Sequence, residues 1–127
     1  MSRKHAVNVY DVRLVAAGVI PRTTSGKLAL ISSRMGSVSL MSSTSGWLYR
    51  VSKAAANAAL RAASLELGPH GVVCVAFHPG WVRTEMGGAG ADIDAATSVS
   101  GIRRVLATAN ASQNGKFLNF NGEQLSW

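Results

Sequence analysis

The distribution of apolar and polar positions along the chain predicts three buried strands and three helices in alternation. Short apolar runs bounded by turn residues predict strands near 27–33, 72–77 and 115–120. Longer stretches without an internal breaker predict helices over 6–20, 47–67 and 94–109, with Asp94 as an N-cap. Continuous apolar strands that alternate with helices indicate an α/β fold, in which parallel strands are covered on both faces as in a Rossmann-like doubly wound sheet.

Two polar loops are expected to lie at the same edge of this sheet. The Gly/Ser/Thr-rich segment 34–46 follows the first strand, and segment 78–93 follows the second. Parallel sheets bind ligands in the loops that follow the carboxyl ends of their strands. A binding site is therefore predicted where these two loops meet.

Composition narrows the function classes. The 127 residues suffice for a single domain spanning 1–127, and no apolar run approaches the ~20 residues needed to cross a membrane. A single cysteine, Cys74, excludes an internal disulfide and predicts a reducing, cytoplasmic location, with a buried inert thiol. The net charge of +7 comes from scattered Lys and Arg, which favours a generally basic surface over a nucleic-acid site. No spacing of His and Cys predicts a metal site.

Tyr49 and Lys53 are the first candidates for chemistry. They lie four residues apart in the predicted helix 47–67 and so share one of its faces. A free tyrosine is a poor acid or base at neutral pH, because its pKa is near ~10, and a neighbouring ammonium group favours the phenolate form. Such a pair can exchange a proton with a substrate oxygen. The spacing also occurs by chance in helices, so the pair needs its context.

Ser33 supplies that context. It is placed at the carboxyl end of the first predicted strand, on the same rim and within reach of Tyr49. A serine hydroxyl there can hydrogen-bond a substrate carbonyl and hold its developing charge. The alternative is a simple turn residue at the end of a strand. No His–Asp pattern supports Ser33 as a hydrolytic nucleophile.

Three segments in this order resemble the short-chain dehydrogenase/reductase family, and within it the branch of small C-factor-like oxidoreductases. They are "ALISSRMGS", "YRVSKAAANAAL" and "VVCVAFHPGWVRTEMGG", and the resemblance extends over roughly residues 6–127. It implies hydride transfer between NAD or NADP and a small carbonyl or alcohol substrate. It implies that Tyr49 exchanges the proton, Ser33 orients the substrate oxygen, Lys53 assists Tyr49 and binds ribose, and Asn8 supports a relay water.

The resemblance also implies a cofactor-binding set and a substrate cover. The cofactor-binding residues would be Tyr49, Lys53, Pro79, Gly80, Trp81, Val82 and Thr84. Segment 85–93 would be a mobile cover, and residues around Leu40–Trp47 would help to shape the substrate pocket. Two of the assignments have plain alternatives, because Asn8 could be a polar residue at a helix start and Trp81 could serve packing.

The sequence matches only the C-terminal half of the family pattern. The glycine-rich turn that binds pyrophosphate after a first strand is absent from the 127 residues. "MGGAGAD" at 86–92 follows no strand directly and is rejected as a phosphate loop. The strand 27–33 is thus expected to present an unpaired edge, and we expect a homo-oligomer or pairing with a complete relative. The alternative to a working oxidoreductase is a non-catalytic remnant or interaction module that pairs through its helix faces.

Overall fold

The computed structural model describes residues 26–127 and contains one four-stranded sheet with a helix on each face. The predicted helix over 6–20, which carries Asn8, lies outside the described residues. The elements in chain order are β1 (Lys27–Ile31), α2 (Trp47–Leu67), β2 (Val73–His78), α3 (Ala95–Thr108), β3 (Lys116–Asn119) and β4 (Gln124–Leu125), with short 3-10 helices η2 (Arg34–Gly36), η3 (Gly68–His70) and η4 (Ala111–Gln113).

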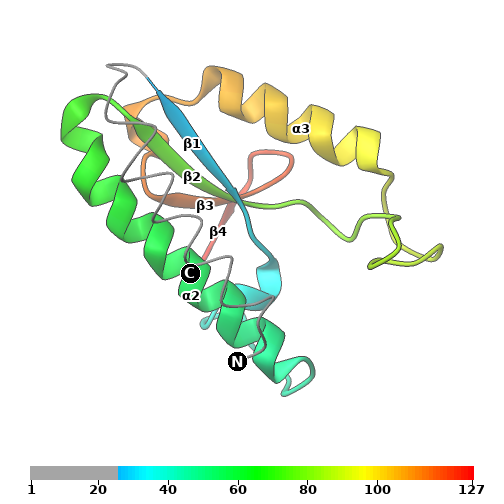
Figure 1. Ribbon diagram of the computed structural model, residues 1–127. Coiled ribbons are helices and arrows are strands. Elements are labelled where there is room, and N and C mark those ends of the chain that lie inside the picture. Colours follow the sequence, from blue (N-terminus) through cyan, green and yellow to red (C-terminus); the bar gives the residue numbers. More distant parts are fainter. Residues whose placement is uncertain (1–25) are drawn as a thin grey trace.

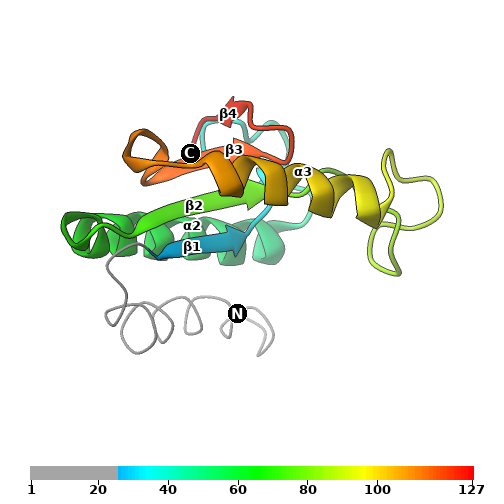
Figure 2. The ribbon, with the colours of Figure 1, turned by 90° about the horizontal axis from the view of Figure 1, so that it is seen from above.

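The strands lie in the order β1-β2-β3-β4, and the first three are parallel, as predicted. Figure 2 shows β1 and β4 at opposite sides of the sheet. Strand β4 was not predicted and runs antiparallel to β3 through a tight turn at Gly122. Strand β4 has only two residues, too few for an alternation of apolar and polar side chains to be recognised in the sequence. The strand is therefore identified only by its pairing with β3.

Helices α2 and α3 cover opposite faces of the sheet (Figure 1). Side chains alternate along β2: Cys74 and Ala76 pack with Leu60 and Ala63 of α2. Val75 and Phe77 pack instead with Ile102 of α3 and its neighbours. Because both faces are covered, Val73 to Phe77 are all buried, which explains the continuous apolar run.

The observed bounds differ little from the predicted ones. Helix α2 has the predicted limits, and α3 begins after Asp94, whose carboxylate accepts the Thr97 amide at 2.7 Å as an N-cap. The strand predicted over 27–33 ends at Ile31, so Ser32 and Ser33 lie outside it. Within the segment predicted as a loop, residues 34–36 form η2, because Ser33 caps this turn.

None of the described helices is long and apolar enough to cross a membrane.

Candidate functional site

The described candidate catalytic residues, Ser33, Tyr49 and Lys53, lie where β1 ends and α2 begins, whereas Asn8 is outside the described residues. Tyr49 and Lys53 lie in the first two turns of α2, and both are partly buried. The Lys53 ammonium lies 5.8 Å from the centroid of the Tyr49 ring, within the range of a cation–π contact. The predicted sharing of one helix face is therefore confirmed.

Lys53 also ties α2 to the end of β1. Its Nζ donates a hydrogen bond to the Ile31 carbonyl over 3.3 Å. Partial burial lowers the pKa of Lys53, because the charged form loses solvation. The Lys53 amine is held at the carboxyl end of a parallel strand, where such folds bind ligands.

Ser33 is buried and acts as the N-cap of η2. Its Oγ accepts a hydrogen bond from the Met35 amide at 3.1 Å. A serine hydroxyl has one donor proton and two acceptor lone pairs, so this contact leaves the proton available for a ligand oxygen. Ser33 can therefore cap the turn as an acceptor and still donate its hydroxyl proton to a ligand, so the structural and the catalytic interpretation are compatible.

Gly36 brings the Ser33 turn against Lys53. A Cβ at Gly36 would lie only 2.8 Å from both the carbonyl carbon and the Cβ of Lys53. Only a glycine permits this approach of η2 to α2. Gly36 was not singled out in the sequence, where it is one small residue in a Ser-rich loop; its role depends on a contact with a residue 17 positions later.

The predicted cofactor segment forms an ordered loop after β2. The Pro79 carbonyl accepts a hydrogen bond from Ser98 Oγ at 2.6 Å, which ties the loop to the first turn of α3. Gly80 has φ of 85°, and a Cβ at this position would lie only 2.7 Å from Ile93 and 3.2 Å from Phe120. Ser98 was missed, because a buried serine in a helix has no distinctive sequence signal.

The loop after β2 is also held by contacts among its own residues. Val82 pairs with Ile93, the Trp81 indole N–H donates to the Gly87 carbonyl at 2.9 Å, and Thr84 Oγ1 accepts the Gly87 amide at 3.2 Å. Trp81 remains about half exposed, at 54%. The loop thus has internal structure, and its indole lies on the surface and not in the core.

The two parts of the site meet through the ends of β1 and β2. The Ser32 amide donates to the Phe77 carbonyl at 2.7 Å, and the Arg34 amide donates to Nδ1 of His78 at 3.0 Å. The predicted common rim for the two loops is therefore confirmed by direct contacts. His78, which was given no role in the sequence, supplies one of these two links.

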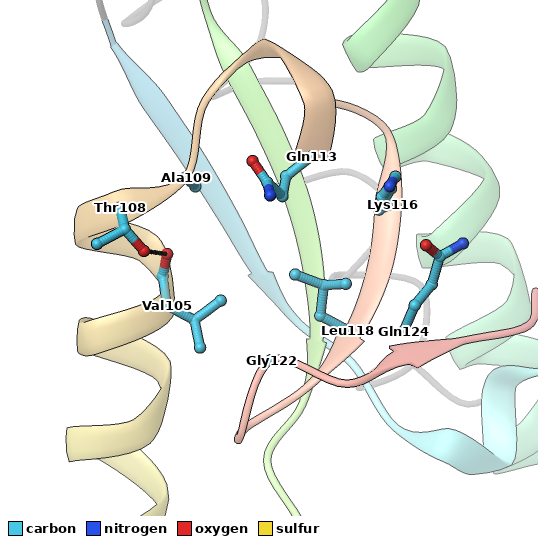
Figure 3. A pocket seen from close by; sticks show the side chains of 8 residues that line it. All are labelled: Val105, Thr108, Ala109, Gln113, Lys116, Leu118, Gly122 and Gln124. Atoms are coloured by element: carbon cyan, nitrogen blue, oxygen red, sulfur yellow. Dashed lines mark hydrogen bonds between the residues drawn. The ribbon is translucent and has the colours of Figure 1, made fainter.

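A separate hollow of about 140 Å³ lies between the end of α3, η4 and the β3–β4 turn (Figure 3). It is lined by Val105, Thr108, Ala109, Gln113, Lys116, Leu118, Gly122 and Gln124. None of the predicted site residues within 26–127 lines it. The hollow therefore has no part in the arrangement around Tyr49 and Lys53.

A parallel sheet covered by helices, with a tyrosine and a lysine on one helix beside a serine turn, defines an α/β protein of the Rossmann class. The family model described as "Enoyl-(Acyl carrier protein) reductase" matches residues 1–116. The "C-signal" protein of Myxococcus xanthus is 38% identical over 130 residues, which cover 100% of this chain and 78% of that protein. The chain belongs to the short-chain dehydrogenase/reductase family.

Solved structures agree with this assignment. The carbonyl reductase Sniffer of D. melanogaster matches with a TM-score of 0.80 and 32% identity. The NADPH-bound carbonyl reductase from chicken fatty liver matches with a TM-score of 0.84 and 30% identity. In both cases 100% of this chain is covered, but only 59% of the other. The chain thus corresponds to somewhat more than half of each of these enzymes, in agreement with the predicted C-terminal half.

Proposed function

We propose that the chain provides the proton-transfer side of an NAD(P)-dependent oxidoreductase that acts on a small carbonyl or alcohol. The observation that carries the proposal is the position of the Lys53 ammonium, 5.8 Å from the Tyr49 ring and bonded to the end of β1. In this proposal the Tyr49 hydroxyl gives a proton to the carbonyl oxygen of the substrate, or accepts one from an alcohol. The Ser33 hydroxyl donates a hydrogen bond to the same oxygen, while the Met35 amide fixes the position of Oγ.

The donor groups at this corner fit the ribose of a nicotinamide cofactor. An ammonium group has three N–H donors, and the 3.3 Å bond to Ile31 uses only one of them. Lys53 could therefore serve a ribose hydroxyl, and the tight turn at Gly80 would let the backbone of Pro79 to Val82 approach the nicotinamide. A nicotinamide bound there would supply or accept the hydride. Asn8 is proposed to support a relay water, and Thr84 to contact the carboxamide or a phosphate.

A titration with NADH and NADPH tests the cofactor part of this proposal. Calorimetry on the wild-type chain is compared with Lys53→Ala and with Lys116→Ala, a partly buried lysine that lies in the separate hollow. Loss of a hydrogen bond from a charged group costs about 1.5–3 kcal/mol, so Lys53→Ala should weaken binding by roughly tenfold or more while Lys116→Ala leaves it unchanged. Equal affinities for the wild type and Lys53→Ala would overturn the assignment of Lys53.

A second variant separates proton transfer from binding. Tyr49→Phe removes the hydroxyl and keeps the ring, so the loss of cofactor affinity should be much smaller than in Lys53→Ala. Reduction of a test aldehyde should fall by about 10²-fold or more, because the proton donor is lost. A Tyr49→Phe protein with undiminished turnover would exclude Tyr49 as the acid.

A different candidate function is a non-catalytic module that pairs with a second copy or with a complete relative. It is favoured by the exposed apolar side chains of α2, where Trp47 is 73% exposed and Leu65 is 64% exposed. Large apolar surfaces of this kind mark association sites in soluble proteins. Mixing with a full-length family member, followed by size-exclusion chromatography, tests this alternative directly.

A further inference from the structure

His78 occupies a junction that the proposed chemistry does not use. It is the last residue of β2 and follows Cys74 and Ala76 on the face that α2 covers. It is only partly exposed, and its Nδ1 accepts the backbone N–H of Arg34 at 3.0 Å. This bond links the end of one strand to the turn that follows the neighbouring strand.

The bond to His78 fixes the backbone next to Ser33. On one side of Ser33, the Ser32 amide is bonded to the Phe77 carbonyl at 2.7 Å. On the other side, the Arg34 amide is bonded to the imidazole. The residues flanking Ser33 are thus both held by consecutive residues of β2, and the position of the Ser33 hydroxyl depends on both contacts.

The bond requires an imidazole that carries no proton on Nδ1. A backbone amide can only donate, so a proton on Nδ1 would place two N–H groups opposite each other. Desolvation, followed by the positive charge of Arg34, lowers the pKa of His78, which favours the neutral ring. The residue paired with His78 on β3 is the uncharged Asn119. Lys53 of α2 is bonded to Ile31, which pairs with Phe77, the residue before His78.

We propose that His78 is a positioning residue, whose unprotonated Nδ1 holds the Ser33 turn in place and whose protonation releases it. In the releasing step one proton moves from solvent to Nδ1, and the hydrogen bond from the Arg34 amide is broken. The Arg34 amide cannot accept the new Nδ1 proton, because it is itself a donor. The turn is therefore ordered at neutral and alkaline pH and loosened in mild acid.

This inference deepens the proposed function, since Ser33 is the residue that would bind the substrate oxygen, but its test does not depend on catalysis. Nitrogen-15 NMR at pH 8 should show His78 with its proton on Nε2 and an unprotonated Nδ1. As the pH is lowered, the amide signals of Ser33, Arg34 and Met35 should shift with the same midpoint as the His78 ring. A proton on Nδ1 at pH 8, or turn amides that do not follow the ring, would overturn the proposal.

Matched variants separate the hydrogen bond from the charge. Asparagine carries an amide oxygen at the position of Nδ1, so His78→Asn should keep the wild-type turn signals at pH 8 and retain them down to pH 5. His78→Leu lacks an acceptor and should show the loosened turn at every pH. The control is His70→Asn, an exposed histidine in η3, which should behave as the wild type. Turn signals in His78→Asn that still titrate like those of the wild type would contradict the proposal.

The outcome is distinct from that of the enzymatic assay. If the turn follows the His78 ring but no variant or wild-type protein reduces an aldehyde, the positioning role stands and the proposed activity fails. If the chain is active, His78→Asn should retain kcat/KM at pH 8 and lose the decline in mild acid that the wild type shows. His78→Leu should then have reduced kcat/KM at all pH values.

Discussion

At the scale of single residues, the site depends on small side chains as much as on the reactive ones. Tyr49 and Lys53 carry the proposed chemistry, but Gly36 permits the close approach of η2, the turn that Ser33 caps, to Lys53 in α2. Ser98 and His78 hold the two strand-end loops by one hydrogen bond each. Each of these contacts joins residues that are distant in sequence.

Gly36→Ala should destabilise the protein and displace the Ser33 turn. The added Cβ would lie 2.8 Å from the Lys53 backbone, and relief of such an overlap typically costs about 1–3 kcal/mol. Urea denaturation measures the loss. The control is Gly90→Ala, where a Cβ would meet no atom within 4 Å, and the prediction fails if the two variants have the same free energy of unfolding.

Stability should depend on pH through His78. Burial and Arg34 lower the pKa of this residue in the folded state, so the unfolded chain binds the proton more readily. The contribution to stability is complete above the pKa of about 6.5 expected for an unfolded histidine, and it is lost as the pH falls through the folded pKa. Urea midpoints between pH 5 and 8 should therefore decline more for the wild type than for His78→Asn, whereas His70→Asn should follow the wild type.

At the scale of elements, Asn114 joins α2, β2 and the start of β3. Its Oδ1 accepts the Cys74 amide at 2.8 Å, and its Nδ2 donates to the Ser64 carbonyl at 2.9 Å. Gly115, with φ of 75°, then turns the chain into β3. One side chain thus determines how the end of η4 meets both the helix and the central strand.

Asn114→Ala should cost about 1–3 kcal/mol, because the buried Cys74 amide loses its acceptor. Guanidinium unfolding followed by circular dichroism gives the free energy of unfolding. Asn121→Ala is the matched control, since its carboxamide oxygen accepts the Glu123 amide in an exposed turn. Equal losses in the two variants would contradict the role of Asn114.

At the scale of the whole molecule, two surfaces of the described residues are candidates for association, the exposed face of α2 and the edge of β1. Val51, Ala58 and Leu65 recur every seven residues on α2, and all three are exposed. On the described part of the chain, β1 pairs with β2 on one side only. An unpaired strand edge and an apolar helix face both favour contact with another chain.

Leu65→Glu should reduce self-association without unfolding the chain. The side chain is 64% exposed, so a charge there disturbs a contact between molecules and not the core. Sedimentation velocity across a concentration series should show larger species for the wild type than for the variant. Val99→Glu, an exposed aliphatic on α3, should sediment as the wild type, and a wild-type protein that stays monomeric would refute self-association.

The amino-acid sequence by itself determined most of the described elements, the family, and the spacing of the candidate pair Tyr49 and Lys53. Helix α2 and the three parallel strands follow from apolar periodicity, and Tyr49 and Lys53 share a face because of helical geometry. The tertiary structure alone decided what depends on long-range contact: the antiparallel β4, the close approach at Gly36, and the bonds made by Ser98 and His78. The physical reason is that periodicity records local geometry, whereas a contact between distant residues depends on how the elements pack.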